Sequence, residues 1–141
     1  MPQTDVLIIG SGIAGLSFAI KVAKRFPKNQ VTVITKADDS ESNTKYAQGG
    51  IAVVLDELTD SFQKHIDDTL RAGDELCDKD VVELVVKEGP DRLREIIEWG
   101  VEFDQDATGK LALGREGGHT AKRIIHYKDV TGLQIERGLL N

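Results

Sequence analysis

The first part of the chain alternates short apolar runs with a segment of helical periodicity. Residues 6–9 and 31–34 form continuous apolar or β-branched runs, which are typical of parallel strands covered on both faces. Between the runs, apolar positions recur every three to four residues: Leu16, Ala19, Ile20, Ala23 and Phe26. The pattern predicts a buried strand, a helix and a second buried strand.

A glycine-rich turn joins the first strand to this helix. Gly10, Gly12 and Gly15 have the spacing G-x-G-x-x-G. In dinucleotide-binding βαβ units the first glycine permits the tight turn, the second lets the backbone approach a pyrophosphate, and the third lets helix and strand pack closely. The helix N-terminus then binds the negative charge. The sequence predicts an α/β, Rossmann-like domain that binds a dinucleotide, with a ligand-free turn as the alternative.

Three further helices are expected in the middle of the chain. Thr59 or Asp60 can cap a helix that ends near Gly73, and Asp78 starts another. The pair Gly89-Pro90 is expected to interrupt that second helix, with Pro90 in the first turn of a following helix that ends at Trp99.

Strands and a last helix are expected after Trp99. Residues 101–103 and 111–113 are predicted to be strands on either side of a turn at 106–110. A short strand should run through Tyr127, and Thr131 is a possible cap of the final helix.

Composition narrows the class of protein. With 141 residues and 40% hydrophobic residues, the chain has the length and apolar content of one domain. A net charge of -6 without a basic patch argues against nucleic acid and membrane surfaces as partners. Cys77 is the only cysteine and is expected to be a buried apolar thiol. No membrane-length apolar run or signal-peptide pattern is present, so a cytoplasmic location is expected.

The end of the second predicted strand departs from the common dinucleotide pattern. Lys36 stands where a carboxylate would accept hydrogen bonds from the adenosine ribose. Asp38 and Asp39 lie too far along the chain, so Thr35 or main-chain carbonyls would have to take that role. This departure points towards a specialised group of flavoproteins.

Residues 42–52 identify that group. Their sequence, S-N-T-K-Y-A-Q-G-G-I-A, resembles the flavin-contacting loop of succinate dehydrogenase and fumarate reductase flavoproteins and of L-aspartate oxidases. A polar surface loop is the alternative. In succinate dehydrogenases a histidine of this loop bonds covalently to the flavin, and Asn43 occupies that position here. The resemblance therefore implies FAD held without a covalent bond.

The resemblance also implies which residues contact FAD. The pyrophosphate would lie against Gly10, Ser11, Gly12, Ile13, Ala14 and Gly15, and Lys36 would lie near the adenosine. The flavin would be bordered by Asn43, Thr44, Lys45, Tyr46, Ala47, Gln48, Gly49 and Gly50.

Polar residues gather again at 115–126. A charged turn beside a strand is the alternative to a binding site here. The run Arg115-Glu116-Gly117-Gly118-His119 resembles the corresponding run of L-aspartate oxidases. Succinate and fumarate enzymes typically carry an aromatic residue in place of Glu116. An anion at Glu116 would orient the ammonium group that distinguishes aspartate from succinate. Glu116 is the implied substrate-orienting residue, and His119 is implied to bind substrate beside it. Residues 129–132 resemble the D-x-T-G segment of the same family.

His65 and Asp68, one turn apart on a predicted helix, could share a metal ion or a hydrogen bond. The structural interpretation is preferred because the sequence shows no third ligand, so no metal is predicted.

For the whole enzyme the resemblance implies oxidation of L-aspartate to iminoaspartate, the first step of de novo NAD biosynthesis. Dioxygen or fumarate would reoxidise the flavin, and quinolinate synthase would use the product. Residues 1–141 would be the N-terminal part of the FAD-binding domain, incomplete at its C-terminus and without the capping and C-terminal helical domains. We expect such a fragment to lack turnover and to self-associate through exposed apolar sheet surface. The alternatives are a fumarate reductase or succinate dehydrogenase-like flavoprotein and a non-catalytic nucleotide-binding module.

Overall fold

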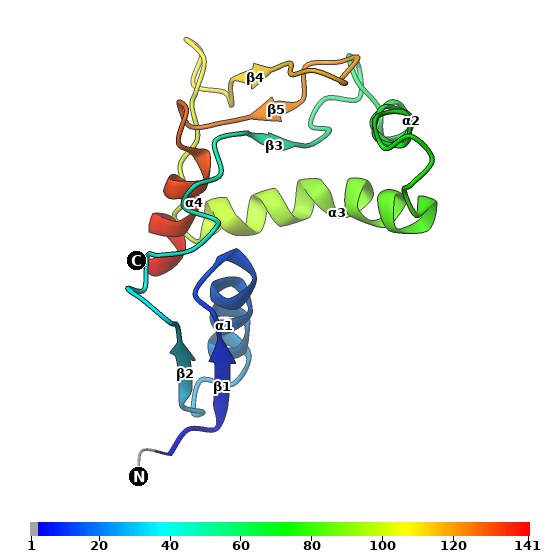
Figure 1. Cartoon of the computed structure of the whole chain (residues 1–141). Coiled ribbons are helices and arrows are strands. Elements are labelled where there is room, and N and C mark those ends of the chain that lie inside the picture. The colour runs from blue at the N-terminus through cyan, green and yellow to red at the C-terminus, as the bar shows by residue number, and fades with distance from the viewer. Residues whose placement is uncertain (1–2) are drawn as a thin grey trace.

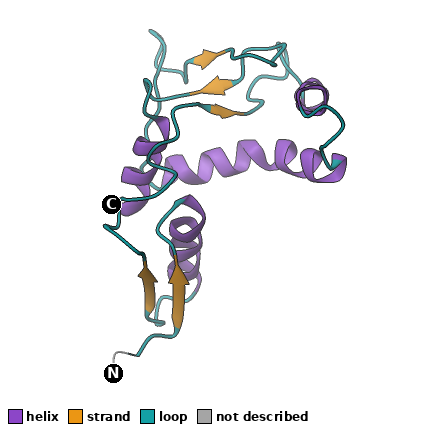
Figure 2. Cartoon of the chain, viewed as in Figure 1, coloured by secondary structure: helices purple, strands orange, loops and turns teal. Residues whose placement is uncertain are grey.

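The computed structural model describes residues 3–141. Its elements in chain order are β1 (Val6–Ile9), α1 (Ile13–Arg25), β2 (Val31–Ile34), β3 (Ile51–Ala52), α2 (Phe62–Ala72), α3 (Lys79–Glu98), β4 (Leu113–Gly114), β5 (Ile124–Ile125) and α4 (Thr131–Leu140). In Figure 1, α3 lies between α1 and the sheet formed by β3, β4 and β5, and α4 lies beside the C-terminal end of α3. Figure 2 shows the two small sheets at opposite sides of this helical layer.

The predicted βαβ unit is confirmed. Strands β1 and β2 pair in parallel from Val6↔Val31 to Ile9↔Ile34, and α1 connects them. The pairing continues into the glycine turn, where the Gly10 N–H donates to the Ile34 carbonyl at 2.8 Å. A Cβ on Gly15 would lie 2.0 Å from the Gly10 carbonyl oxygen. Only glycine therefore lets α1 pack this closely against the turn.

The expectation that both faces of these strands are covered is wrong for this chain. Ile8 is buried on the α1 side, but Leu7 and Ile9 are 54% and 81% exposed. Ile34 on β2 is 45% exposed. Successive strand residues point to opposite faces, and α1 covers only one of them. Phe26, which caps the C-terminus of α1, is also exposed rather than part of a buried face.

The second sheet is antiparallel and contributes to the hydrophobic core. Its strand order is β3-β5-β4, with Ile125 opposite both Ile51 and Leu113. The core cluster joins α1, α3, α4 and this sheet, and its buried members are Leu16, Val53, Leu93, Ile96, Val101, Phe103, Ile125, Ile135 and Leu139. The core thus holds the N-terminal part of α1, where the glycine turn lies, against α3 and α4.

Helix α3 is continuous, so the predicted interruption at Gly89-Pro90 is wrong. Pro90 lacks a backbone N–H and would normally weaken a helix interior. It lies instead on the buried stripe of α3, together with Val86, Leu93 and Ile96. Packing of this buried stripe stabilises α3 by more than the lost hydrogen bond destabilises it, so the helix continues through Pro90.

The helix caps agree with the sequence only in part. Asp78 caps α3 as expected, accepting from the N–H groups of Asp80 and Val81. Helix α2 is capped by Ser61, whose hydroxyl accepts from the Lys64 N–H, and not by Thr59 or Asp60. Val130 is the N-cap residue of α4, so the proposed Thr131 cap is also wrong.

Thr131 and Cys77 have other environments. The Thr131 hydroxyl accepts from the Tyr127 N–H at 3.1 Å and is fully buried. Cys77 is half-buried rather than buried, with its Sγ 3.8 Å from the Thr69 carbonyl oxygen.

The predicted strands after Trp99 are shorter than expected. Residues 101–103 form no strand, although the Asp104 N–H donates to the His126 carbonyl. The turn at 106–110 is confirmed, with the Asp106 carboxylate accepting from the N–H groups of Thr108 and Lys110. Strand β4 covers only Leu113–Gly114, and β5 ends at Ile125, before Tyr127. Local bonds to Asp104 and Asp106 replace a regular ladder in this region.

Candidate functional site

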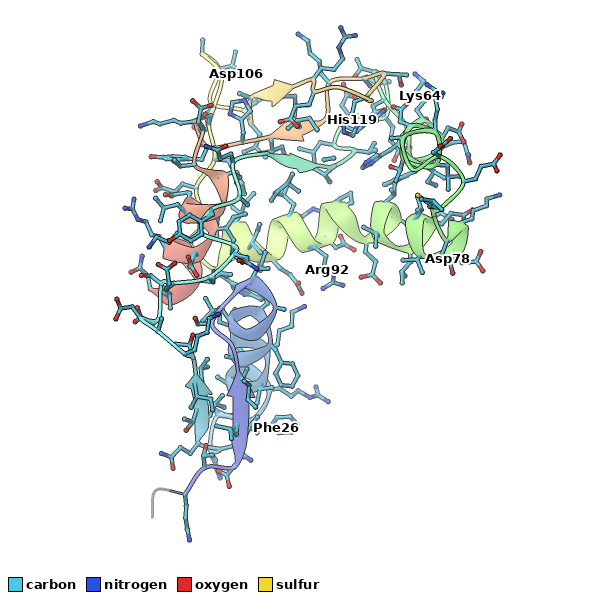
Figure 3. The ribbon with its side chains drawn as sticks, viewed as in Figure 1. Phe26, Lys64, Asp78, Arg92, Asp106 and His119 are labelled. Carbon is cyan, nitrogen blue, oxygen red and sulfur yellow. The ribbon has the colours of Figure 1, made fainter. Side chains whose placement is uncertain are left out.

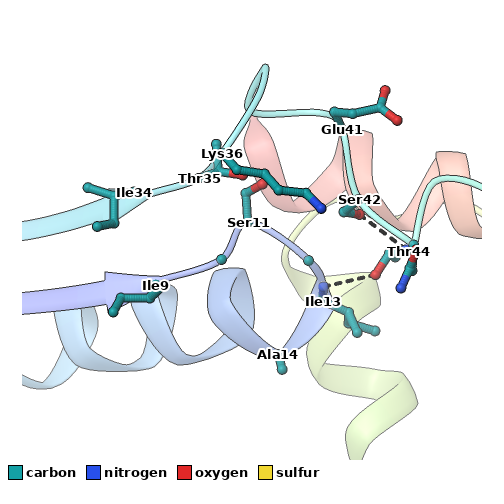
Figure 4. A pocket seen from close by; sticks show the side chains of 13 residues that line it. Ile9, Ser11, Ile13, Ala14, Ile34, Thr35, Lys36, Glu41, Ser42 and Thr44 are labelled. Carbon is teal, nitrogen blue, oxygen red and sulfur yellow. Dashed lines mark hydrogen bonds between the residues drawn. The ribbon is translucent and has the colours of Figure 1, made fainter.

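A cavity of about 650 Å³ opens where β1 and β2 end and α1 begins. Figure 4 shows its lining from the glycine turn, the end of β2 and the loop that follows. The lining residues are Ile9, Gly10, Ser11, Gly12, Ile13, Ala14, Ile34, Thr35, Lys36, Glu41, Ser42, Asn43 and Thr44. Eight of the implied cofactor residues therefore share one cavity: Gly10, Ser11, Gly12, Ile13, Ala14, Lys36, Asn43 and Thr44.

The glycine turn presents polar groups to this cavity. Ser11 is buried, and its Oγ has no hydrogen-bond partner in the part of the chain described, residues 3–141. A buried hydroxyl without a partner is costly, so it indicates a ligand at this point. Gly12 caps α1 without a side chain, and the first turn of α1 contains no acidic residue. A helix N-terminus of this kind suits a pyrophosphate.

The loop after β2 is held against α1 and α4 by a chain of hydrogen bonds. The Thr44 hydroxyl accepts from the Ile13 N–H at 3.0 Å, and the Thr44 N–H donates to Ser42 Oγ at 3.1 Å. The Ser42 hydroxyl donates to Glu136 Oε1 of α4 at 2.5 Å. Glu136 is fully buried, and its Oε2 has no partner among the described residues. This chain of contacts fixes one wall of the cavity.

Charged residues occupy the rim of the cavity. Lys36 and Thr35 line it at the end of β2, where the sequence lacked a ribose-binding carboxylate. Glu41 also lines it and accepts hydrogen bonds from Tyr46 and Lys45. Both hydrogen bonds lower the pKa of Glu41, and the bond from Tyr46 has the larger effect. Lys45 and Tyr46, implied to border the flavin, thus contact Glu41 instead of lining the cavity.

The remaining implied flavin residues lie outside the cavity, on the way to β3. Ala47 accepts at its carbonyl from the Gly132 N–H at 2.9 Å. A Cβ on Gly132 would lie 1.9 Å from the Thr44 carbonyl oxygen, so the D-x-T-G segment packs directly on this loop. Gln48 and Gly49 are exposed, and Gly50 lies against Ile125. Gly15 supports the turn from below and does not line the cavity.

Glu116 and His119 form a separate turn near α2. The His119 N–H donates to the Glu116 carbonyl at 3.3 Å, and Gly118 has a φ of +83° between them. Glu116 is exposed and His119 half-buried. Figure 3 shows His119 and Lys64 at one end of the molecule and Phe26 at the other. The structure therefore brings Glu116 and His119 together but places neither in the cavity at the glycine turn.

A buried charge cluster supports this turn. Arg123 is only 1% exposed and donates to both carboxylate oxygens of Asp60, at 2.7 Å each. It also donates to Asp68 at 2.6 Å. Asp68 accepts in addition from the N–H and the hydroxyl of Thr120. Burial by itself would raise the pKa of Asp68. The hydrogen bonds from Thr120 and Arg123 have the larger combined effect and lower the pKa from 3.8 to about 2.

His65 faces this cluster without binding Asp68. Its ring lies 5.7 Å from that of His119, and its Nδ1 has no partner among residues 3–141. Burial lowers the pKa of His65, as do the nearby Arg123 and His119. Among the described residues no group of His, Cys, Asp and Glu side chains could hold a metal ion. The carboxylate of Asp68 binds Arg123 and Thr120 instead.

Sequence reasoning missed the partners that hold these sites. Glu41 and Glu136 belong to the first site, while Asp60 and Arg123 belong to the second. Ionic residues are usually exposed, so nothing in the local pattern marked Glu136, Asp60 and Arg123 as buried. Among residues 3–141, no helix combines the length and apolarity needed to cross a bilayer.

A cavity at the carboxyl ends of parallel strands and at a helix N-terminus is where doubly wound folds bind dinucleotides. The geometry thus defines a dinucleotide-binding domain. Residues 5–140 match the family of FAD binding domains, and the chain belongs to this family. FAD is its cofactor, and the unpartnered Ser11 hydroxyl in the cavity fits such a ligand.

Curated relatives are L-aspartate oxidases. The chain is 53% identical over 136 residues to L-aspartate oxidase 2-b, chloroplastic, of Nicotiana tabacum, a match covering 96% of this chain and 20% of that protein. It is 47% identical over 141 residues to L-aspartate oxidase of Yersinia pestis, covering 97% and 26%. The resemblance seen in the sequence is confirmed, and the chain spans a fifth to a quarter of the length of these relatives.

Solved structures show the same fold. A mutant of E. coli quinol fumarate reductase aligns with a TM-score of 0.89 at 34% identity, covering 99% of this chain and 24% of that chain. The Mycobacterium smegmatis Sdh1 complex aligns with a TM-score of 0.86 at 38% identity, covering 96% and 23%. The Rossmann-like α/β assignment is therefore confirmed.

Proposed function

We propose that the protein to which this chain belongs oxidises L-aspartate to iminoaspartate with FAD as cofactor. The observation that carries the proposal is the identity of 45–53% to curated L-aspartate oxidases over 96% of this chain. The chain supplies the dinucleotide-binding end of the site. The substrate end is represented here by the turn at Glu116 and His119.

The cavity residues have distinct roles in this proposal. The turn from Gly10 to Ala14 holds the pyrophosphate at the α1 N-terminus, and Lys36 lies near the adenosine. Asn43 lines the cavity but has no imidazole nitrogen to bond to a flavin, so FAD is held non-covalently. Residues 44–50 border the flavin, with Ser42 and Glu136 fixing the loop from which they extend.

Glu116 and His119 are proposed to orient substrate. The Glu116 carboxylate attracts the ammonium group of aspartate, and His119 donates a hydrogen bond to one of its carboxylates. Bound FAD supplies the hydride acceptor, because redox chemistry belongs to the cofactor. The substrate loses its α-hydrogen with the electron pair and an N–H proton to become iminoaspartate. Reoxidation by dioxygen gives hydrogen peroxide, and reoxidation by fumarate gives succinate.

We place this reaction first in de novo NAD biosynthesis, with quinolinate synthase as the enzyme that uses iminoaspartate. We propose that this chain by itself binds FAD weakly and lacks turnover, because it spans only 20–26% of the length of the L-aspartate oxidases that it matches, and turnover needs a site that closes over substrate and excludes water. A cytoplasmic location stays a prediction, and relatives from plants are named chloroplastic.

Two measurements test these proposals. Titration of this chain with FAD, followed by quenching of flavin fluorescence, should show saturable binding. An aspartate-dependent peroxide assay should give no turnover with this chain and clear turnover with the full-length protein. Activity of the full-length protein with succinate but not aspartate would overturn the substrate assignment.

A fumarate reductase or succinate dehydrogenase-like flavoprotein is the second candidate. The structural likeness to quinol fumarate reductase favours it, because the fold and the flavin loop are shared. Asn43 and Glu116 argue against it, since the resemblance places a histidine and an aromatic residue at these positions in those enzymes. A non-catalytic nucleotide-binding module is the third candidate, and it predicts that the full-length protein stays colourless when FAD is supplied.

A further inference from the structure

The side chain of Arg123 is held unusually firmly for a cation. Arg123 is fully buried. Its backbone carbonyl accepts a hydrogen bond from the Val53 N–H at 2.9 Å, and this bond extends the pairing of β3 with β5. The planar guanidinium binds Asp60 through Nε and Nη2 in a two-pronged contact. Such a contact fixes the plane of the group as well as its position.

The Nη1 atom of this fixed group has two hydrogens to donate. One contact is with Asp68 Oδ2 at 2.6 Å, and the other is with His119 Nδ1 at 3.0 Å. A guanidinium can donate but cannot accept a hydrogen bond. His119 Nδ1 must therefore be the acceptor, and the ring proton must be on Nε2.

The backbone that follows His119 is held by Asp68 of the same cluster. The His119 N–H closes the turn on the Glu116 carbonyl. The next residue, Thr120, donates from its N–H and its hydroxyl to Asp68 at 2.8 and 2.9 Å. The ring of His119 is thus tied to Arg123, just before β5, and the adjoining backbone is tied to Asp68 on α2.

We propose that Arg123 is a positioning residue for the site at Glu116, and that it fixes His119 as a donor through Nε2–H. A fixed Nε2–H on His119 supplies one donor in the same turn as the exposed Glu116 carboxylate, which supplies an acceptor, and this pair matches a ligand carrying both a carboxylate and an ammonium group. The identity of that ligand rests on the proposed function. The orientation of His119 does not, because it follows from contacts within the chain.

The test is NMR spectroscopy of this chain labelled with ¹⁵N at histidine and arginine. His65, His119 and His126 are assigned from single His→Gln variants. The expected result is a proton on Nε2 of His119 and a coupling across the hydrogen bond between Arg123 Nη1 and His119 Nδ1. A proton on Nδ1 of His119, or no coupling in the folded chain, would overturn the proposal. This measurement needs no variant at Arg123.

Substitution gives a second, independent readout. Arg123→Lys keeps the charge but cannot repeat the fork, so the two ring nitrogens of His119 should shift towards values averaged over both tautomers. Arg71→Gln is the matched control, because Arg71 lies 3.7 Å from the other oxygen of Asp68 but its side chain is 70% exposed. An unchanged His119 spectrum in a folded Arg123→Lys chain would contradict the positioning role.

Addition of L-aspartate to the labelled chain separates this inference from the proposed function. A shift of the His119 Nε2 signal with aspartate but not with succinate would support both. No shift with either ligand would count against the substrate assignment in this chain and leave the tautomer result standing.

Discussion

Single residues, namely buried carboxylates and half-buried hydroxyls, determine the local geometry of both sites. Ser42, Glu136 and Thr44 hold the loop at the dinucleotide cavity, and Asp68 holds the turn near α2. Each accepts from a donor far away in the chain or from a backbone N–H that would otherwise be unpaired. Removal of the Ser42 hydroxyl leaves the buried Glu136 carboxylate without its hydrogen bond, which costs about 1–3 kcal/mol.

Asp68 should make stability depend on pH in the acid range. Its pKa is lowered from 3.8 to about 2 in the folded chain, so the unfolded chain binds the proton more readily. The stabilisation is complete well above pH 3.8 and is lost as pH falls towards 2, by at most about 2 kcal/mol. Urea unfolding between pH 5 and pH 2 measures it. Asp68→Asn should unfold at lower urea at pH 5 and show a flatter acid dependence than Asp67→Asn, an exposed neighbour. Equal slopes in the two variants would contradict the assignment.

At the scale of elements, the stability of a helix depends on which residue caps its N-terminus. Ser61 caps α2, whereas the nearby Thr59 hydroxyl donates only to Asp56. Ser61→Ala should therefore reduce the free energy of unfolding by about 1 kcal/mol, as is usual for loss of an N-cap. Thr59→Ala is the control and should cost clearly less. Chemical denaturation of both variants checks this, and a larger loss for Thr59→Ala would restore the cap expected from the sequence.

The junction of β1 and α1 should be intolerant of any side chain at Gly15. The Cβ of Gly15→Ala would lie 2.0 Å from the Gly10 carbonyl oxygen, so the turn must open and move the α1 N-terminus away from the cavity. FAD binding should weaken by at least tenfold in a fluorescence titration. Gly117→Ala is the control, because its Cβ would meet no atom within 4 Å. Unchanged binding in the Gly15 variant would show that this close approach does not shape the cavity.

At the scale of the whole molecule, the uncovered face of the β1-β2 sheet should drive self-association. Leu7 and Ile9 are exposed on the same face of β1, and each strand of this two-stranded sheet also has an unpaired edge. Leu7→Lys should shift the chain towards monomer in light scattering. Leu58→Lys adds the same charge at a loop residue that is 96% exposed and should leave association unchanged. A monomeric wild-type chain would contradict the prediction.

The sequence predicted the βαβ unit correctly because its signals are local. Strand runs, helical periodicity and three glycines act within neighbouring residues, and Gly10 to Ala14 line the cavity as expected. Local signals were misleading at Gly89-Pro90, where Pro90 lies on the buried stripe of α3 and the helix stays continuous. They were also misleading at Thr59 and Asp60, because Asp60 pairs with Arg123 and leaves the cap to Ser61.

The amino-acid order by itself determined the dinucleotide fold, the glycine turn and the resemblance that points to FAD and aspartate. Only the tertiary structure decided which residues hold these sites in shape. Arg123 meets Asp60 across 63 residues, and Ser42 meets Glu136 across 94. Such contacts carry no local periodicity, and each charged residue alone would be assigned to the surface. Burial of a charge is stable only when its partner is buried with it, and that condition is met only after the chain has folded.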